Sequence, residues 1–401
     1  MLALGDNDRR AKANAWRLAA GVALAGANGA VIFATGGIVG LQTAPDPALA
    51  TLPLSLYVVG QAAGALPAGA IARAKGRRTA FIVGTGLGCL SGLIGALAIV
   101  RGAFALFCFA TFLGGAYGAV AQSYRFAAAD GASEAFRPRA VAWVMAGGVL
   151  AGVLGPQLVT WTMNFWAPYL FAVSFLAQAA VALVAMAVVA SVDLDKPTPG
   201  DTAGARPLGQ VVKQPAFIGA ALCGVVSFAT MNMVMTSAPL AMKICGFGPA
   251  DSNLVIQWHI VAMYLPSFFT GALIARFGAP KIVAIGLAGI AAAAVTGLAG
   301  VSLGHFSLGL ILLGAGWNFG FIGASAMVLE THRASERNKV QAFNDFLVFG
   351  TMAVGSFSSG ELLALYGWAS VNWVVFPPVM LALATLALAA RARRAAIAAL
   401  T

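Results

Sequence analysis

The sequence predicts an all-α polytopic membrane protein with twelve transmembrane helices in two six-helix halves. Of its 401 residues, 60% are hydrophobic and only 9% are charged, whereas soluble chains average about 25% charged residues. The apolar residues fall into runs of about 20, the helix length that crosses a bilayer. Twelve such helices take up about 240 residues, which leaves loops and termini but no room for a soluble domain.

The predicted helices divide evenly around a polar segment at the middle of the chain. A polar stretch of fourteen residues precedes the first apolar run, so we expect a first spanning helix and no cleaved signal peptide. The predicted domains are an N-terminal bundle over 1–191, a cytoplasmic linker over 192–213 and a C-terminal bundle over 214–401. The predicted spans are 15–41, 51–73, 79–100, 103–124, 139–163, 166–191, 216–240, 253–275, 281–301, 305–329, 340–365 and 371–392.

Lysine and arginine are distributed as membrane topology requires. With this assignment of helices, 22 of the 24 basic residues fall on one side of the membrane, and only Arg101 and Lys243 fall on the other. The positive-inside rule therefore predicts that both termini are cytoplasmic. The same pattern accounts for the net charge of +11 without nucleic acid as a partner, and leaves the lipid bilayer as the expected surroundings.

A short motif occurs once in each half. Residues 69–78 read GAIARAKGRR and residues 271–281 read GALIARFGAPK, about 200 residues apart, as expected for a duplicated six-helix unit. Both segments resemble the loop signature G-x-L-a-D-R-x-G-R-R of the major facilitator superfamily, although Arg73 and Ala275 stand where that family has aspartate. The resemblance implies the fold of that superfamily.

Chemistry-bearing residues inside the predicted spans are few. No Ser-His-Asp set or carboxylate pair has a plausible spacing, so we do not expect an enzyme. Acidic residues within a membrane are rare and usually functional. Asp345, near the start of the predicted helix 340–365, is therefore a candidate for binding a coupling proton, while a solvated or paired structural role is an equal alternative.

Methionine and histidine form the most specific pattern in the chain. The predicted helix 216–240 contains MNMVM, so Met231 and Met235 share a face, and the next helix contains HIVAM, so His259 and Met263 do likewise. At 1.5 Å per residue, Met235 and His259 lie about 8 and 9 Å from the outer ends of their helices, and Met231 and Met263 about 14 and 15 Å. Three thioethers and one imidazole are therefore predicted at matched depths.

These ligand types favour a soft metal ion. Thioether sulfur prefers Cu(I) to zinc, iron or manganese, and neutral ligands bind weakly enough for a carrier to release its ion. We therefore expect copper as a transported substrate and no tightly bound cofactor. Cys223 and Cys245 are candidate transient thiols, although a free cysteine in an apolar helix is more often a small buried hydrophobe. A methionine stripe can equally be core packing or the lining of an organic-solute cavity, and a membrane histidine can relay protons.

The paired motifs resemble those of the CcoA-type copper importers, a branch of the major facilitator superfamily. This resemblance implies copper uptake across the bacterial inner membrane for assembly of a cbb3-type haem-copper cytochrome oxidase. It assigns metal handling to Met231, Met235, His259 and Met263, and makes a cytoplasmic copper chaperone a candidate partner.

Two other functions are compatible with the sequence. The first is a carrier of an organic solute such as riboflavin, because relatives in this branch include such transporters. The cavity residues would then be Trp258, Trp317, Phe319 and Asn318. The second is a copper sensor or receptor, which the lack of a soluble output domain disfavours.

Overall fold

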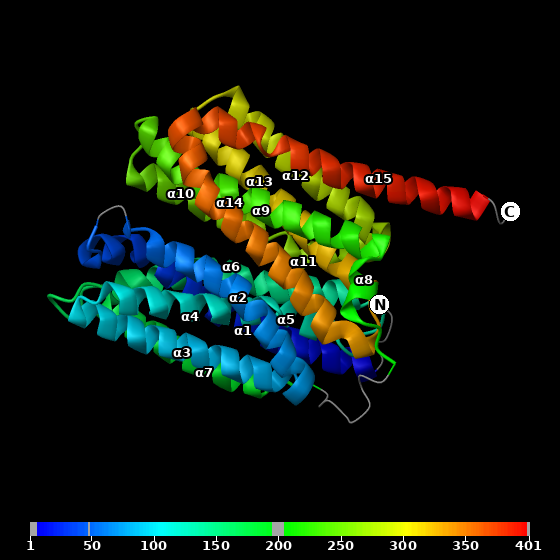
Figure 1. The fold of residues 1–401 in the computed structure, drawn as a ribbon, viewed down its shortest axis with the longest axis horizontal. Helices are drawn as coiled ribbons and strands as arrows, with labels where there is room; N and C mark the ends of the chain where they lie inside the picture. Colours follow the sequence, from blue (N-terminus) through cyan, green and yellow to red (C-terminus); the bar gives the residue numbers. More distant parts are fainter. Residues whose placement is uncertain (1–5, 47–48, 195–203, 399–401) are drawn as a thin grey trace. The chain divides into compact units, whose positions relative to one another are not determined.

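The structure is a computed structural model that describes residues 6–46, 49–194 and 204–398. Within these ranges all regular elements are helices, and eleven stretches are long and apolar enough to cross a membrane. The prediction of an all-α polytopic membrane protein is therefore confirmed. The last two predicted helices correspond to α14 and α15, which share a continuous apolar stretch over 358–391 (Figure 1).

The chain forms two compact units. Unit 1 comprises Met1–Leu208 and His332–Ala353, and unit 2 comprises Gly209–Thr331 and Val354–Thr401. The long helix α14 therefore contributes its first part to unit 1 and its second part to unit 2. The predicted domain boundaries at 191 and 214 stay a prediction, and the central part of the predicted linker, 195–203, lies outside the described residues.

Unit 1 is built from closely packed helices with small residues at their contacts. α1 packs against α6 and α7, α2 packs against α4, and α3 packs against both α4 and α7, as the neighbouring ribbons of α3 and α7 show (Figure 1). A side chain at Gly115 would collide with the backbone carbonyl of Tyr57, so glycine permits the approach of α4 to α2. The elements are α1 (Asp6–Thr43), α2 (Leu52–Lys75), α3 (Arg77–Arg101), α4 (Phe104–Gln122), α5 (Tyr124–Ala129), α6 (Arg137–Thr162), α7 (Ala172–Ala190), the 3₁₀ helix η2 (Ala334–Glu336) and the start of α14 (Arg337–Trp373).

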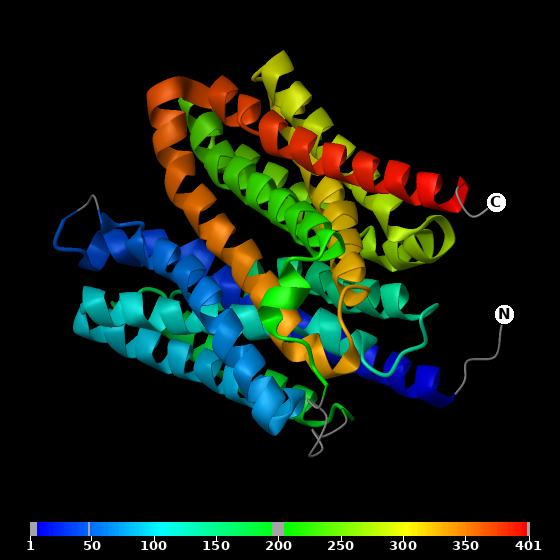
Figure 2. The ribbon, with the colours of Figure 1, turned by 45° about the vertical axis from the view of Figure 1, so that its right-hand side comes forward.

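Unit 2 is organised around α13, which packs against α9, α10 and α12. The terminal helix α15 lies beside α9 and α12, and Figure 2 shows α15 in red next to α9 in green. The described elements of this unit are α8 (Leu208–Val212), α9 (Pro215–Ile244), α10 (Pro249–Tyr264), α11 (Ser267–Phe277), α12 (Ala279–Ala299), α13 (Leu303–Leu329), the end of α14, and α15 (Phe376–Ala398).

The repeated sequence motif folds into the same turn in both units. α2 ends at Gly76, which has φ 89° and ψ 158°, and α11 ends at Gly278, which has φ 86° and ψ 144°. Positive φ values are accessible to glycine at no steric cost. The two turns then lead directly into α3 and α12, so the duplication inferred from the motif extends to backbone geometry.

Proline and glycine move several helix ends away from their predicted positions. The predicted helix 253–275 is two helices, α10 and α11, separated at Pro266, because proline has no N–H to donate to the preceding turn. α14 continues past the predicted end at 365 to Trp373, and its backbone leaves helical geometry at Gly367, where φ is 76°. The last helix therefore begins at Phe376 rather than at 371.

Candidate functional site

The predicted metal-handling residues lie on α9 and α10 of unit 2. Met231 is buried on α9 and Met235, one turn further along, is half-buried. On α10, His259 is fully buried and Met263 is 7% exposed. All four side chains thus belong to the interior of this unit or its margin, which is where methionine most often serves as flexible packing.

The imidazole of His259 is hydrogen-bonded to a neighbouring helix. Its Nδ1 lies 2.7 Å from the backbone carbonyl of Leu310 on α13, so Nδ1 carries the hydrogen and donates it. Its Nε2 is buried and has no hydrogen-bond partner. A substituent at Gly314 would meet the His259 carbonyl at 2.7 Å, which shows how closely α13 approaches this turn. The ring therefore ties α10 to α13.

The two candidate thiols lie in the first half and at the end of α9. Cys223 is buried in α9, whereas Cys245 is exposed at its end, and both are free thiols. Among the described residues there is no group of three or more His, Cys, Asp or Glu side chains that could hold a metal ion. The assignment of these residues to transport stays a prediction.

Aromatic side chains from three helices form a cluster around Trp317 on α13. The Trp317 ring stacks on Phe321 with centroids 5.3 Å apart, and meets the edges of Phe228 at 5.5 Å and Tyr264 at 5.6 Å. Trp317 is fully buried and its Nε1 has no hydrogen-bond partner. The cluster joins α9, α10 and α13, and offers aromatic faces together with one buried donor.

The next residue, Asn318, is the centre of a neutral hydrogen-bond network. Its Nδ2 donates to the Met263 carbonyl at 2.6 Å and to Ser267 Oγ at 2.7 Å, and its Oδ1 accepts from Thr270 Oγ1 at 2.6 Å. Asn318 thereby links α13 to both α10 and α11 on either side of Pro266. Of the other two alternative cavity residues, Trp258 is 53% exposed and Phe319 is half-buried.

Asn232 on α9 is the buried amide that sequence reasoning missed. It is 7% exposed, and its Nδ2 has no hydrogen-bond partner. It stands inside the MNMVM motif, between Met231 and Met233. Since buried polar groups are nearly always hydrogen-bonded, an unpaired amide in an apolar helix is a candidate contact for a solute.

Asp345 is paired rather than isolated. Its Oδ1 lies 2.5 Å from Arg125 Nη2, and the two side chains are 4% and 0% exposed. Asn344 donates to the same oxygen at 3.2 Å. The paired structural role is therefore what the structure shows for this carboxylate, and its role in proton coupling stays a prediction. The signal that could have found its partner was Arg125 itself, because an arginine at the end of an apolar helix needs a counter-charge.

A second set of ionic contacts surrounds Arg77, at the start of α3. Its Nε lies 2.6 Å from Asp130 Oδ2, and the same oxygen lies 3.7 Å from Arg337 Nη1. Arg77 Nη2 also donates to Gln341 Oε1 at 2.5 Å. Thus Asp130 supplies the carboxylate to this loop, where Arg73 occupies the aspartate position of the family motif.

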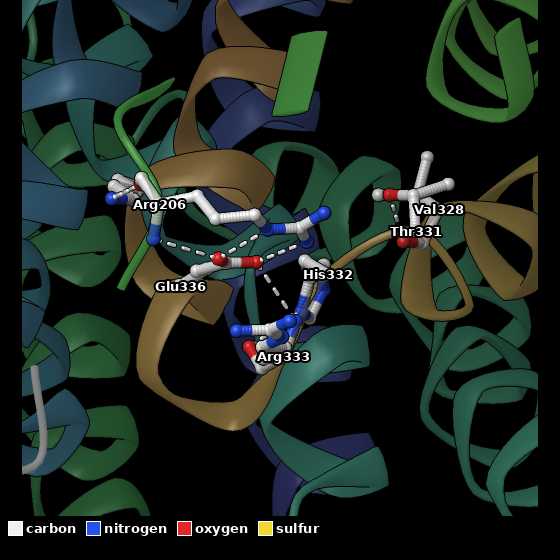
Figure 3. Close-up of polar contacts among 7 residues, drawn as sticks. Arg206, Val328, Thr331, His332, Arg333 and Glu336 are labelled. Atoms are coloured by element: carbon white, nitrogen blue, oxygen red, sulfur yellow. Dashed lines mark hydrogen bonds and ion pairs between the residues drawn. The ribbon is translucent and has the colours of Figure 1, made fainter. Parts of the chain in front are cut away.

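A third ionic contact joins the segment before α8 to the short helix η2. Arg206 donates to Glu336 from Nε at 2.7 Å, from Nη2 at 2.6 Å and from its backbone N at 2.9 Å. The backbone N of Arg333 donates to the same carboxylate at 3.0 Å (Figure 3). Bonds from Arg206 hold the pKa of Glu336 well below its ordinary value. Glu336 is fully buried and remains ionised at neutral pH.

Similar proteins identify the type of molecule. The chain is 46% identical over 377 residues to the riboflavin transporter RfnT of Brucella anthropi, covering 93% of this chain and 95% of that protein. It is 30% identical to the uncharacterized MFS-type transporter YdeG of Bacillus subtilis, over 84% of this chain and 83% of that protein. The solved structure of the proton:xylose symporter XylE bound to 6-bromo-6-deoxy-D-glucose has a TM-score of 0.80 and 16% identity, with 94% and 95% coverage.

These relatives correct the predicted substrate. A protein nearly half identical over almost the whole chain is a riboflavin transporter, so the predictions of a CcoA-type copper importer, of Cu(I) as substrate, of a copper chaperone as partner and of a link to cytochrome oxidase are wrong. The physical reason is that four-residue spacing on a helix places methionines on one face whether that face binds a metal or packs. The spacing of Met231, Met235, His259 and Met263 does not distinguish the two cases.

The family assignment agrees with the fold. The pattern described as Major Facilitator Superfamily matches residues 18–263 and 220–399, which together take in almost all of the described helices. The predicted fold is therefore confirmed, and the molecule is a transporter rather than an enzyme. On this sequence match and on the 46% identity to a transporter over 93% of the chain, the chain belongs to the major facilitator superfamily.

Proposed function

We propose that this protein carries riboflavin across a bacterial inner membrane by alternating access. The observation that carries the proposal is the 46% identity to the riboflavin transporter of Brucella anthropi over 93% of this chain. Two related halves that expose a central site in turn are the usual basis of such transport. The excess of lysine and arginine on one side supports cytoplasmic termini in this proposal.

The interior of unit 2 suits an uncharged solute. Among its described residues, the buried polar side chains are hydroxyls, amides and the imidazole of His259, with no buried Asp, Glu, Lys or Arg. Riboflavin is uncharged at neutral pH and has a flat ring system and a hydroxylated chain. Sites for such molecules are mostly apolar and aromatic, with a few polar groups that fix orientation.

Two atoms are the best candidates to meet the solute. Asn232 Nδ2 on α9 and Trp317 Nε1 on α13 are buried donors without a protein partner, and α9 packs against α13. A flavin carbonyl or a ribityl hydroxyl is the kind of acceptor that each lacks. We therefore assign solute contact to these two residues rather than to the methionines.

Uptake of radiolabelled riboflavin tests the proposal. Cells unable to make or import riboflavin should accumulate it when they express this chain, and unlabelled flavin mononucleotide should compete poorly because its phosphate is charged. Absence of accumulation, with the protein shown to be in the membrane, would overturn the assignment. The direction of net transport follows from the same assay in vesicles of opposite orientation.

The site is tested by Asn232→Leu. Loss of one hydrogen bond should raise the half-saturating riboflavin concentration about 2- to 12-fold. The matched control is Thr296→Val, since the Thr296 hydroxyl donates to the Ala292 carbonyl of its own helix. An unchanged concentration in Asn232→Leu would remove Asn232 from the site without affecting the identity of the substrate.

A further inference from the structure

His332 belongs to a chain of hydrogen bonds in which Arg77, at one end, determines which groups donate and which accept. Arg77 Nη2 donates to Gln341 Oε1 at 2.5 Å, and arginine has donors only. The amide of Gln341 therefore has its oxygen toward Arg77 and its nitrogen toward His332. Gln341 Nε2 lies 3.0 Å from His332 Nε2, so this imidazole nitrogen must accept and cannot carry a hydrogen.

The other imidazole nitrogen completes the assignment. His332 Nδ1 lies 3.1 Å from the backbone carbonyl of Arg333, which can only accept. The hydrogen is thus on Nδ1, and the ring is neutral. His332 and Arg333 lie next to the Glu336 carboxylate in Figure 3, in the segment between Thr331 and the start of α14.

We propose that His332 is a proton-binding site whose occupation breaks the hydrogen-bond chain from His332 through Gln341 to Arg77 and so loosens the start of α14. Protonation places a hydrogen on His332 Nε2, directly opposite the Gln341 amide hydrogens. Gln341 cannot turn its amide to accept, because its oxygen would then leave Arg77 facing a second donor. One of the two bonds must break.

The charged groups around the ring already have partners of their own. Asp130 is held by Arg77 and Arg337, and Glu336 is held by Arg206 and by the backbone of Arg333. The guanidinium of Arg77 opposes a further positive charge, whereas the two carboxylates favour it. Burial is the largest influence and lowers the pKa of His332 below its ordinary 6.5, so the ring is neutral at pH 7.5 and the bonds are lost on acidification.

The hydrogen bonds of Gln341 lie beside a close contact between α14 and α2. A side chain at Gly69 of α2 would collide with Ala342 and would lie 3.0 Å from the Asn338 carbonyl, so the first turns of α14 are in close contact with α2. Gln341 stands between these two residues on α14. Loss of its bond to Arg77 or to His332 removes a polar tie from this contact within unit 1, whatever solute the protein carries.

Hydrogen–deuterium exchange of the full protein in detergent micelles tests the proposal. Backbone amides of residues 333–345 should exchange at least tenfold faster at pH 5.0 than at pH 7.5, after correction for the intrinsic effect of pH. His332→Gln places an acceptor near the Nε2 position and does not titrate, so its exchange should be the same at both values. His305→Gln is the control, because His305 belongs to unit 2 and its replacement should leave the wild-type response intact.

A permanent positive charge at position 332 distinguishes the effect of a charged His332 from other effects of acid on the protein. His332→Lys should show fast exchange of the same segment already at pH 7.5, and Gln341→Leu should do so without any further response to acid. Equal protection of the wild type at pH 7.5 and 5.0 would overturn the proposal. So would equal exchange of His332→Lys and His332→Gln at pH 7.5.

Discussion

The two units differ in the polar side chains that they bury. Unit 1 buries full charges, with Arg77, Arg125, Glu336 and Asp345 all less than 8% exposed. The buried polar groups of unit 2 that the structure describes are neutral, and the network around Asn318 is its largest. Three ionic contacts of unit 1, those of Asp345, Glu336 and Arg337, join the segment 332–353 to the first half of the chain. The network around Asn318 instead joins helices within 60 residues of one another.

This difference indicates where each kind of contact is useful. A buried ion pair is costly to desolvate and contributes little net stability, but it strongly penalises the loss of either partner. It therefore suits a position where one particular segment must dock. Neutral amides and hydroxyls are cheaper to bury and also suit an interior that must admit an uncharged solute.

The largest effect is expected at Arg125. Arg125→Ala should destabilise the protein by about 3–5 kcal/mol, because the buried carboxylate of Asp345 loses its counter-charge. Thermal unfolding in detergent micelles measures this loss. The double variant Arg125→Met with Asp345→Leu removes both charges and should recover most of the stability.

Arg78→Ala is the control for this comparison, because Arg78 is an exposed arginine next to the ionic cluster. It should unfold at the wild-type temperature. If the double variant were as unstable as Arg125→Ala, the cost would come from lost packing rather than from an unpaired charge.

A smaller loss is expected in unit 2. Asn318→Ala leaves the Met263 carbonyl, Ser267 and Thr270 without their shared partner, which should cost about 1–3 kcal/mol. Thermal unfolding again provides the measurement. A loss as large as that of Arg125→Ala would contradict the contrast drawn between charged and neutral networks.

The contact of Arg206 with Glu336 should give a still smaller and pH-dependent effect. Because the pKa of Glu336 is lowered on folding, its contribution is present above its ordinary value of 4.5 and is lost as the pH falls through the lowered value. Glu336→Gln should therefore be less stable than the wild type at pH 7, and the difference should shrink in acid. Glu134→Gln, at an exposed position, should reproduce the wild-type pH profile.

The smallest effect is expected at the methionines. Met231→Leu and Met235→Leu conserve volume, so stability should change by less than about 1.5 kcal/mol, and riboflavin uptake should remain within about twofold of the wild type, since an energy of 0.4 kcal/mol corresponds to a factor of two. A selective loss of uptake in either variant, with normal stability, would show that the thioethers contact the solute.

The fold could be predicted from the sequence because a membrane imposes simple constraints. Runs of about 20 apolar residues, the bias of arginine and lysine, and the motif around Gly76 and Gly278 each depend on local composition. The helix break at Pro266 was missed because a proline in an apolar run can bend a helix or end it, and the choice depends on tertiary contacts. Near Pro266 the Met263 carbonyl and Ser267 are hydrogen-bonded to Asn318, more than 50 positions later, which no local pattern reveals.

For the candidate site, the sequence indicated which residues to consider but not which groups they contact. The spacing of His259 and Met263 placed them correctly on one helix, but not the bond from His259 to Leu310, 51 residues away. Asp345 was identified as unusual, but its partner Arg125 lies 220 residues earlier. Spacing along a helix determines which residues share a face, whereas their partners depend on how distant helices pack.

The division of α14 between the units has a consequence for biosynthesis. Unit 1 is complete only when residues up to Ala353 have been made, although most of it ends at Leu208. At about 5–20 residues per second, the intervening 145 residues take roughly 7–30 s to translate. During that interval Arg77 already has Asp130 as its counter-charge, whereas Arg125 has no Asp345, so its guanidinium must stay hydrated until the second half arrives.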